Sequence, residues 1–160
     1  MERVNRILNN ELYRRYLTKN NEAEAERRFC HHHMGHFLDV ARIALILNYE
    51  ENYGEEQDLI YAAALLHDIG RWVQYEDGTP HEKASAVLAP EILHNSGFFG
   101  EEEEKIISAI VNHRNALIKE EKSLSGLLYR ADKLSRPCFA CEMEKECNWK
   151  NDKKNRRLSV

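Results

Sequence analysis

The sequence predicts an all-α fold, and two observations carry that prediction. Only three prolines and seven glycines interrupt the 160 residues, and apolar residues recur throughout at helical spacing, while the alternation typical of strands is almost absent. A chain of this length forms one domain and buries a core without needing disulfides. We therefore expect a single bundle of about six helices.

The first half of the chain predicts three helices. The first is expected over residues 2–19, and the charged segment 20–28 is expected to be a loop or a solvated helical turn. The second, over 31–49, and the third, over 55–69, follow. The second helix has an inward stripe at spacings of four, four, three and four: His32, His36, Val40, Ile43 and Leu47.

The second half predicts three more helices. After a loop over 71–79, Thr79-Pro80-His81-Glu82 predicts a capping box with proline at the first helical position, and a helix as far as Asn95. A fifth helix is expected to begin at Glu101 to Glu104, where carboxylates favour the helix dipole. A sixth is expected to begin near Ser123.

The domain boundary is expected near residue 136. Residues 1–136 are interpreted as the domain, and 137–160 as a cysteine-containing segment that packs on it and ends in a basic tail. The formal net charge of −4 makes nucleic acid an unexpected partner. No stretch is long and apolar enough to span a bilayer, and the N-terminus lacks the apolar core of a signal peptide, so we expect the cytoplasm. A homodimer is left open.

One apolar run ends in two polar side chains. In Ala62-Ala63-Ala64-Leu65-Leu66-His67-Asp68-Ile69-Gly70-Arg71, both His67 and Asp68 continue inward-facing stripes, and Gly70 can end the helix in a left-handed cap. A buried carboxylate costs several kcal/mol of stability unless a cation or hydrogen bonds compensate it. We therefore predict a metal ion beside this pair.

Three further apolar stripes are continued by ligand-type residues, namely His36, His113 and Asp132. One such histidine alone is more often a hydrogen-bonded core residue than a ligand. Four occurrences on four helices favour a site inside the bundle, with nitrogen and oxygen donors suited to Mn, Fe, Zn, Co or Mg.

These residues resemble the motif of the HD superfamily of metal-dependent phosphohydrolases. The motif is a histidine, an adjacent His-Asp pair and a later aspartate. Here it reads His36-Phe37-Leu38-Asp39, then Leu66-His67-Asp68-Ile69-Gly70, then Ala131-Asp132-Lys133. The resemblance runs from about residue 30 to 136 and implies an HD-domain helical bundle.

Some members of that superfamily hold two metals with two further histidines, and His81 and His113 occupy similar positions. The resemblance then implies that Asp68 bridges the two ions. It assigns His36, His67 and Asp132 to one ion, and His81 and His113 to the other. An exposed first-turn histidine is the alternative for His81. The chain is also similar to the small HD hydrolases that split diadenosine tetraphosphate symmetrically.

The implied chemistry is hydrolysis at phosphorus. Two divalent ions lower the pKa of a shared water and stabilise charge on the phosphoryl oxygens, and Asp68 could orient that water. Arg71, Arg114 and Lys133 each follow a proposed ligand and are candidates for gripping phosphate, with solvated surface charges as the alternative. Asp39 either accepts a hydrogen bond near His36 or pairs with Arg42.

The other histidines receive no ligand role. Of His31, His32 and His33, only His32 shares a face with His36, so we place it at the pocket mouth and the other two at the surface. His94 has no partner that the sequence identifies.

Four cysteines form a second group. Cys138-Phe139-Ala140-Cys141 is followed by Cys147, and Cys30 precedes the helix of His36. Such spacing can hold a structural zinc or, less favourably, an iron–sulfur cluster. Free thiols, as expected in a reducing compartment, are the alternative.

We therefore expect a metal-dependent phosphohydrolase that acts on a phosphate ester or anhydride, most plausibly of a nucleotide such as a dinucleoside polyphosphate. A nucleoside monophosphate phosphatase is the nearest rival. A nucleotide-sensing module that does not hydrolyse its ligand is the alternative of a different class.

Overall fold

The computed structural model describes residues 1–160 and contains only helices, turns and loops, so the all-α prediction is confirmed. There are eight α-helices rather than about six. They are α1 (Glu2–Asn9), α2 (Glu11–Ala23), α3 (Met34–Glu50), α4 (Gln57–Leu66), α5 (Arg71–Asp77), α6 (His81–Ser96), α7 (Glu101–Asn112) and α8 (Leu124–Leu134). None of them has the length and apolar character needed to cross a membrane.

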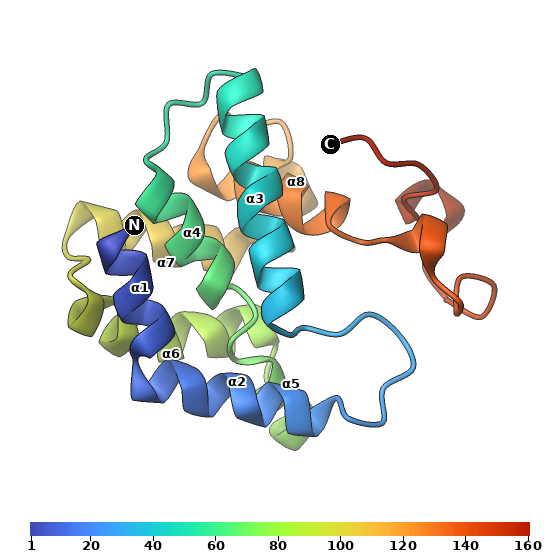
Figure 1. Ribbon diagram of the computed structural model, residues 1–160, viewed down its shortest axis with the longest axis horizontal. Coiled ribbons are helices and arrows are strands. Elements are labelled where there is room, and N and C mark those ends of the chain that lie inside the picture. Colours follow the sequence, from blue (N-terminus) through green and yellow to red (C-terminus); the bar gives the residue numbers. More distant parts are fainter.

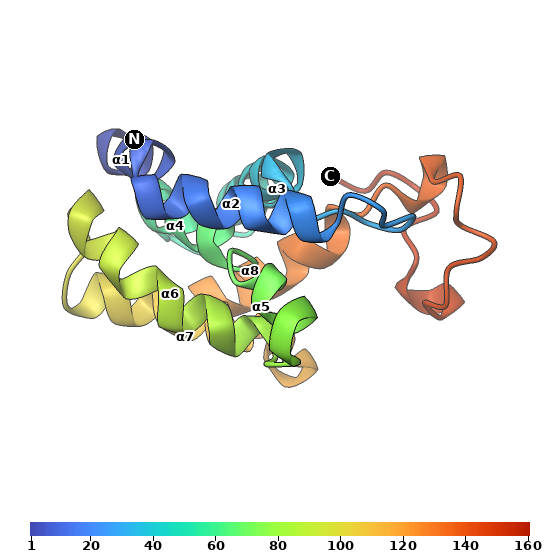
Figure 2. The ribbon, with the colours of Figure 1, turned by 90° about the horizontal axis from the view of Figure 1, so that it is seen from below.

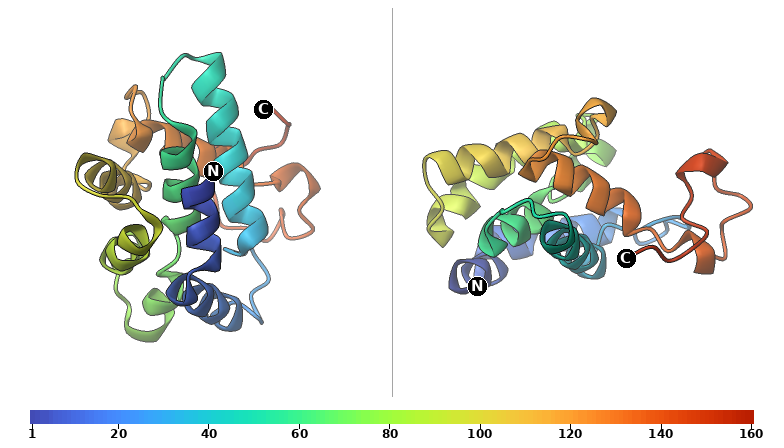
Figure 3. Two further views of the ribbon diagram at one scale, coloured as in Figure 1. Left: turned by 60° about the vertical axis from the view of Figure 1, so that its left-hand side comes forward. Right: turned by 90° about the horizontal axis from the view of Figure 1, so that it is seen from above.

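Helix α4 lies at the centre of the bundle. It packs against α1, α3, α6, α7 and α8, and seven of its ten residues are buried. Figure 1 shows it between α1 and α3, and Figure 3 shows α3 on one side of it with the paired α6 and α7 on the other. Because apolar neighbours surround α4, the residues that follow Leu66 are delivered to the interior of the protein.

The single helix predicted over 2–19 is two helices, because Asn10 breaks it. The backbone of Asn10 is extended, and its side chain accepts hydrogen bonds from the N–H groups of Leu12 and Tyr13, which caps α2. Helix α2 then continues to Ala23, so the prediction of a solvated segment at 20–28 is wrong at Asn20 and Glu24, which are buried.

The loop predicted over 71–79 is also wrong, since most of it forms α5. Gly78 ends this helix in the left-handed conformation, with φ at 82°. The predicted capping box is not formed either: Thr79 makes no capping bond, and Pro80 precedes the helix that starts at His81. Helix α3 starts at Met34 rather than at residue 31, because the His33 side chain accepts from the His36 N–H and caps it.

Gly70 does not form the predicted left-handed cap, since its φ is −94°. A Cβ at this position would lie 2.5 Å from the backbone nitrogen of Ser85, in α6. The Gly70 N–H instead donates to the Ser85 hydroxyl at 2.9 Å. Glycine is therefore required here by close packing, and this contact holds the turn at Asp68 against α6.

The C-terminal segment leaves the bundle after α8. Residues 137–160 contain two 3₁₀ turns, Cys138–Ala140 and Asn151–Lys153, and none of these residues is buried. Figure 2 shows this segment extending beyond the helices, on the side where the loop between α2 and α3 also lies.

Gly70→Ala is expected to lower the free energy of unfolding by about 2–3 kcal/mol, because the methyl group collides with backbone atoms that cannot move aside without separating α5 from α6. Urea unfolding followed by circular dichroism measures this. Gly54→Ala is the control: its φ is 77° but no atom lies within 4 Å, so only about 1 kcal/mol of backbone strain is expected. A loss at Gly70 no larger than that at Gly54 would contradict the packing argument.

Candidate metal centre

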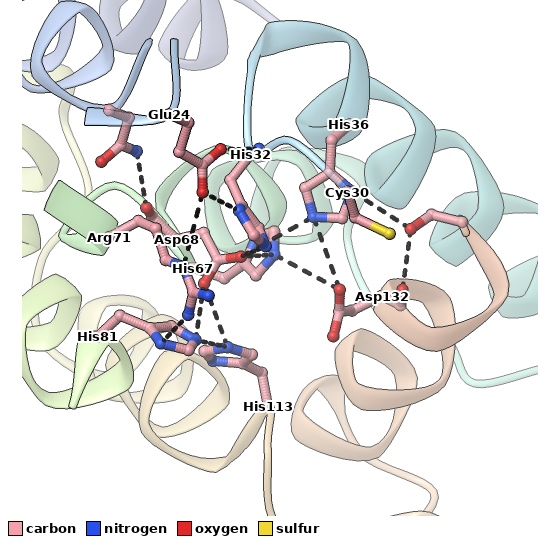
Figure 4. Close-up of polar contacts among 12 residues, drawn as sticks. Glu24, Cys30, His32, His36, His67, Asp68, Arg71, His81, His113 and Asp132 are labelled. Atoms are coloured by element: carbon pink, nitrogen blue, oxygen red, sulfur yellow. Dashed lines mark hydrogen bonds and ion pairs between the residues drawn. The ribbon is translucent and has the colours of Figure 1, made fainter. Parts of the chain in front are cut away.

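Six ligand-type side chains from five parts of the chain meet inside the bundle (Figure 4). They form two groups, in each of which the ligand atoms lie within 4.8 Å of one another: His36, His67 and Asp132 in one, and Asp68, His81 and His113 in the other. His81 is buried, so the alternative of an exposed first-turn histidine is wrong.

The Asp68 carboxylate joins the two groups. Its Oδ2 atom lies 3.4 Å from the Nε2 atom of His67, and its Oδ1 atom lies 3.1 Å from the Nε2 of His81 and 3.4 Å from that of His113. One oxygen of a single buried carboxylate thus faces each group. This arrangement can bridge two cations.

The histidines are held in the tautomer that a metal requires. The Nδ1 atom of His67 donates to the carbonyl of Ala64 at 2.7 Å, and that of His113 donates to the carbonyl of Ile110 at 2.6 Å. Each of these contacts is local, three residues back along the chain. Both rings therefore direct an Nε2 lone pair into the site.

At His36 and His81 the Nδ1 atom contacts side chains instead of a backbone carbonyl. The Ser135 hydroxyl donates to the carbonyl of Asp132 at 2.8 Å, so it accepts from the Nδ1 of His36 at 3.3 Å. The Nδ1 of His81 lies 2.6 Å from the Gln74 amide oxygen, which accepts, and 2.6 Å from an Arg71 guanidinium nitrogen, which donates, so these contacts do not fix the tautomer of His81. The buried Nε2 atoms of His36 and His67 make no hydrogen bond, and an orphaned buried nitrogen needs a partner. The residues present therefore fit a divalent metal.

Burial and charge determine the protonation states. Burial lowers the pKa of His67 to about 3, so its imidazole is neutral at neutral pH. Burial acts to raise the pKa of Asp68, but His67 and the other surrounding imidazoles hold that pKa well below its usual range. For Asp132, burial again opposes ionisation, and the adjacent Lys133 ammonium keeps its pKa below the ordinary value. At His113 burial opposes protonation, but the hydrogen bond and charge of Asp68 raise its pKa above the ordinary value. The metal-free centre thus combines ionised carboxylates and a neutral His67 with a His113 that holds a proton more firmly, and a bound metal would displace that proton.

Asn20 fixes the backbone at Asp68, and the sequence did not indicate it. Its side-chain amide donates to the carbonyl of Asp68 at 2.9 Å and accepts from the N–H of Trp72 at 2.8 Å. Asn20 lies 48 residues from Asp68 in a segment of polar and charged residues, so no local signal distinguishes it.

Glu24 and His32 form a hydrogen-bonded pair beside the centre. The sequence did not indicate Glu24, and it placed His32 at the pocket mouth. Glu24 accepts hydrogen bonds at 2.6 Å from both the backbone N–H and the Nδ1 of His32, and another at 2.8 Å from the Tyr75 hydroxyl. The Nε2 of His32 then lies 3.6 Å from Asp68, closer to the centre than the pocket mouth where we expected it. Burial would raise the pKa of Glu24, but the bonds from His32 and Tyr75 lower it to about 2. The only sequence signal for Glu24 is its spacing of four from Asn20 on one face of α2.

The three candidate phosphate-gripping cations differ in their surroundings. Lys133 contacts the carboxylate of Asp132 and donates to the carbonyl of His113 at 3.3 Å. Arg71 lies 2.6 Å from the Nδ1 of His81 and 3.7 Å from Glu24. Arg114 pairs with Glu82 at 3.2 Å, and its side chain is 52% exposed. Lys133 and Arg71 therefore belong to the centre, whereas Arg114 lies at its rim.

The remaining predicted contacts are peripheral. Asp39 is exposed and makes neither hydrogen bond nor ion pair, with His36 or with Arg42. His31 and His33 are exposed, as expected, and their rings stack. His94 does have a partner: its Nε2 lies 2.8 Å from Glu103 on α7.

A cavity of about 870 Å³ opens over the centre. Its floor includes His36, Asp68, His81, His113 and Asp132, and its walls come from residues 27–33 and from the segment after α8. Cationic side chains on these walls include Arg27, Arg28, Arg136, Lys153 and Lys154. Glu142, Glu144 and Glu146 line the same walls, and Glu146 pairs with Arg28 and Glu144 with Lys154, so the approach to the site combines both charges.

Comparison with known proteins agrees with this geometry. The HD domain family matches residues 34–136. An uncharacterised protein of Clostridium beijerinckii is 48% identical over 158 residues, 99% of each chain. Ribonuclease Y of Enterococcus faecalis is 32% identical, and ribonuclease Y 1 of Pediococcus pentosaceus 30% identical, each over 102 residues that make up 64% of this chain and 18% of the relative. No solved structure matches the chain.

The fold and the site define a helical bundle built around a histidine and aspartate centre that could hold metal. The chain belongs to the HD domain family, the superfamily of metal-dependent phosphohydrolases that its motif resembles. The closer resemblance to diadenosine tetraphosphate hydrolases stays a prediction. The matched region makes up 18% of each ribonuclease Y, so the activity of those proteins is not transferred to this chain.

The neutral His67 predicts a pH dependence of stability in the metal-free protein. The unfolded histidine takes up a proton below its ordinary pKa of 6.5, whereas the folded one does so only near 3. The contribution of His67 to stability is therefore complete above pH 6.5 and is lost as the pH falls towards 3. Between pH 7 and pH 5 the loss is about 2 kcal/mol.

Urea unfolding in the presence of a chelator, at pH 7 and pH 5, measures this loss in the wild type and in His67→Gln. The wild type should lose about 2 kcal/mol more than the variant over this interval. His94→Gln, which changes an exposed histidine, should keep the wild-type dependence. Equal dependence in the wild type and His67→Gln would show that His67 is not held neutral.

Proposed function

We propose that this protein is a two-metal phosphohydrolase that cleaves a phosphate ester or anhydride of a nucleotide. The observation that carries the proposal is the Asp68 carboxylate, which directs one oxygen towards each of two ligand groups in the floor of a cavity. Membership of the HD family supports metal-dependent hydrolysis as the class of reaction.

The residues would hold two divalent ions in the following way. His36, His67 and Asp132 would bind one, His81 and His113 the other, and Asp68 both. Their nitrogen and oxygen donors suit Mn, Fe, Co, Zn or Mg. When bound, such ions supply a nucleophilic water of lowered pKa and offset charge on the phosphoryl oxygens.

The remaining side chains position the substrate and the proton. Asp68 lies where it can orient the attacking water. Lys133 and Arg71, both in contact with proposed ligands, can grip the phosphoryl group that is attacked, and Arg114 at the rim can contact a more distant phosphate. His32, oriented by Glu24, directs its Nε2 towards Asp68 and is placed to exchange a proton with water or leaving group.

The cavity favours a nucleotide among phosphorylated substrates. About 870 Å³ accommodates a ligand of that size. Its wall combines cationic groups, which suit several phosphates, with the exposed aromatic side chains of Phe29 and Trp149, on which a base can stack. A dinucleoside polyphosphate is the specific candidate, and a nucleoside monophosphate is its nearest rival.

A ribonucleotide phosphodiester is the second candidate. It is favoured by the similarity of 102 residues to proteins named ribonuclease Y. The same metals and cations would serve, so only the substrate distinguishes this candidate from the first.

Asp68→Asn is the central test. Protein loaded with Mn²⁺ or Co²⁺ is assayed on an aryl phosphate ester and on a panel of dinucleoside polyphosphates, nucleoside monophosphates and short oligoribonucleotides, with products resolved by chromatography. We expect turnover by the wild type and a loss of kcat/KM of about 1,000-fold in the variant, because the carboxylate that joins the two groups is neutralised.

Asp39→Asn provides the matched control, since it removes a carboxylate that lines the cavity but touches no proposed ligand. Its activity should equal that of the wild type. Unchanged activity in Asp68→Asn would overturn the mechanism. Absence of turnover by the wild type with every metal and substrate would overturn the hydrolase proposal in favour of a sensor.

Glu24→Gln tests the orienting role of Glu24. The amide has one accepting oxygen where the carboxylate has two, so His32 is held less firmly, and we expect kcat to fall by about 10- to 100-fold. Glu26→Gln, an exposed neighbour on the same segment, should leave kcat unchanged. Steady-state kinetics on the best substrate gives the comparison, and equal kcat values for the two variants would refute the role.

A further inference from the structure

The segment after α8 lacks a hydrophobic core of its own. None of residues 137–160 is buried, and their only regular structure is two short 3₁₀ turns. Figures 1 and 2 show the segment extending away from the helices. Val160 is the one hydrophobic residue of the segment that packs against the core of the bundle. Irregular segments of this length with so little apolar burial do not offset their conformational entropy, so an ordered fold here requires another source of stability.

The contacts of this segment with the loop between α2 and α3 indicate where the additional stabilising interaction lies. Arg28 donates to the sulfur of Met143 at 3.4 Å and pairs with Glu146 at 3.4 Å. At the other end, Asn155 donates to the carbonyls of Lys133, Leu134 and Arg136. The segment therefore folds back on the end of α8 and faces the loop that contains Cys30.

The four cysteines of the chain all lie in this region. Cys138 and Cys141 flank one 3₁₀ turn, in which the N–H of Cys141 donates to the carbonyl of Cys138 at 3.3 Å. Cys147 follows six residues later, and Cys30 lies in the facing loop. All four line one cavity, and none forms a disulfide.

We propose that Cys30, Cys138, Cys141 and Cys147 bind one structural zinc ion that joins the C-terminal segment to the loop before α3. A Cys-x-x-Cys pair with two further thiolates is a tetrahedral, closed ligand set of the kind that zinc prefers. Soft sulfur donors also separate this site chemically from the nitrogen and oxygen donors of Asp68 and its neighbours. Each thiol releases its proton as it binds.

Zinc binding requires the cysteines to move closer together. No three of the sulfur atoms lie within 4.8 Å of one another in the structure. Both segments are irregular and lack buried residues near the cysteines, so they can approach without disturbing the helices. Zinc would then fix the wall of the cavity that holds Arg136, Trp149 and Lys153. Zinc binding itself does not depend on the proposed hydrolase activity.

Cobalt substitution of the full-length, reduced protein tests the site directly. Co²⁺ bound by thiolates gives sulfur-to-metal charge-transfer absorption that nitrogen and oxygen ligands do not give. We expect titration of the wild type to reach one such site per chain, and one equivalent of Zn²⁺ to displace it. Asp68→Asn should keep the signal, which separates this site from the centre at Asp68.

Cys141→Ser and Cys30→Ser should each weaken zinc binding at least about 100-fold, because a ligand is lost. Both should make the chain after residue 136 sensitive to trypsin, with the bundle intact by circular dichroism. Cys141→His, which restores a zinc ligand, should recover binding.

Two kinds of result would overturn the proposal. One is a wild-type chain with no cobalt–thiolate absorption, whether its cysteines are free thiols, disulfides or ligands of an iron–sulfur cluster with its own visible spectrum. The other is an unchanged zinc affinity in Cys30→Ser, which would show that zinc does not join the C-terminal segment to the loop that contains Cys30.

Discussion

The buried charge of Asp68 is the constraint on which the rest of the structure depends. Its carboxylate is buried at the floor of the cavity, yet the surrounding imidazoles keep it ionised. Helix α4 holds it in the interior because almost every other residue of that helix is apolar and packed. Asn20 fixes the carbonyl of Asp68, and Gly70 allows α6 to approach it. A site of this kind is costly for the protein alone and favourable once a cation is present, so stability and metal affinity are linked.

The histidines around Asp68 are organised by one repeated device. At His36, His67 and His113 the Nδ1 atom donates to a hydroxyl or carbonyl oxygen, and the Nε2 atom faces the centre. For His67 and His113 that oxygen is supplied three residues earlier by the same helix end, so a short local turn sets the orientation. A neutral His67 and ionised carboxylates then coexist in the centre, and a divalent ion would displace the proton that Asp68 favours on His113.

The helices and the irregular segments contribute different parts of the candidate site. The helices supply the six inward-facing ligand-type side chains, and the two irregular segments, residues 27–33 and those after α8, supply the cationic and aromatic walls of the cavity. Similarity to the ribonuclease Y proteins covers 102 residues, whereas similarity to the Clostridium beijerinckii protein covers 158 residues and so includes the cysteine segment. Substrate selection by irregular walls over a fixed centre is a common arrangement in enzymes.

The sequence by itself determined the helical class and the inward direction of His36, His67, Asp68, His113 and Asp132, because apolar periodicity assigns a face to each residue of a helix. His81 came from the family resemblance alone. Only the tertiary structure decided the break at Asn10, the helix α5 and the burial of Asn20 and Glu24. The partners of these last two residues lie 48 and 8 positions away, or on another helix, and their neighbours in sequence are charged and solvated. Local composition therefore predicted that Asn20 and Glu24 face solvent. The contacts that bury these two side chains form only when α2 packs beside the turn at Asp68.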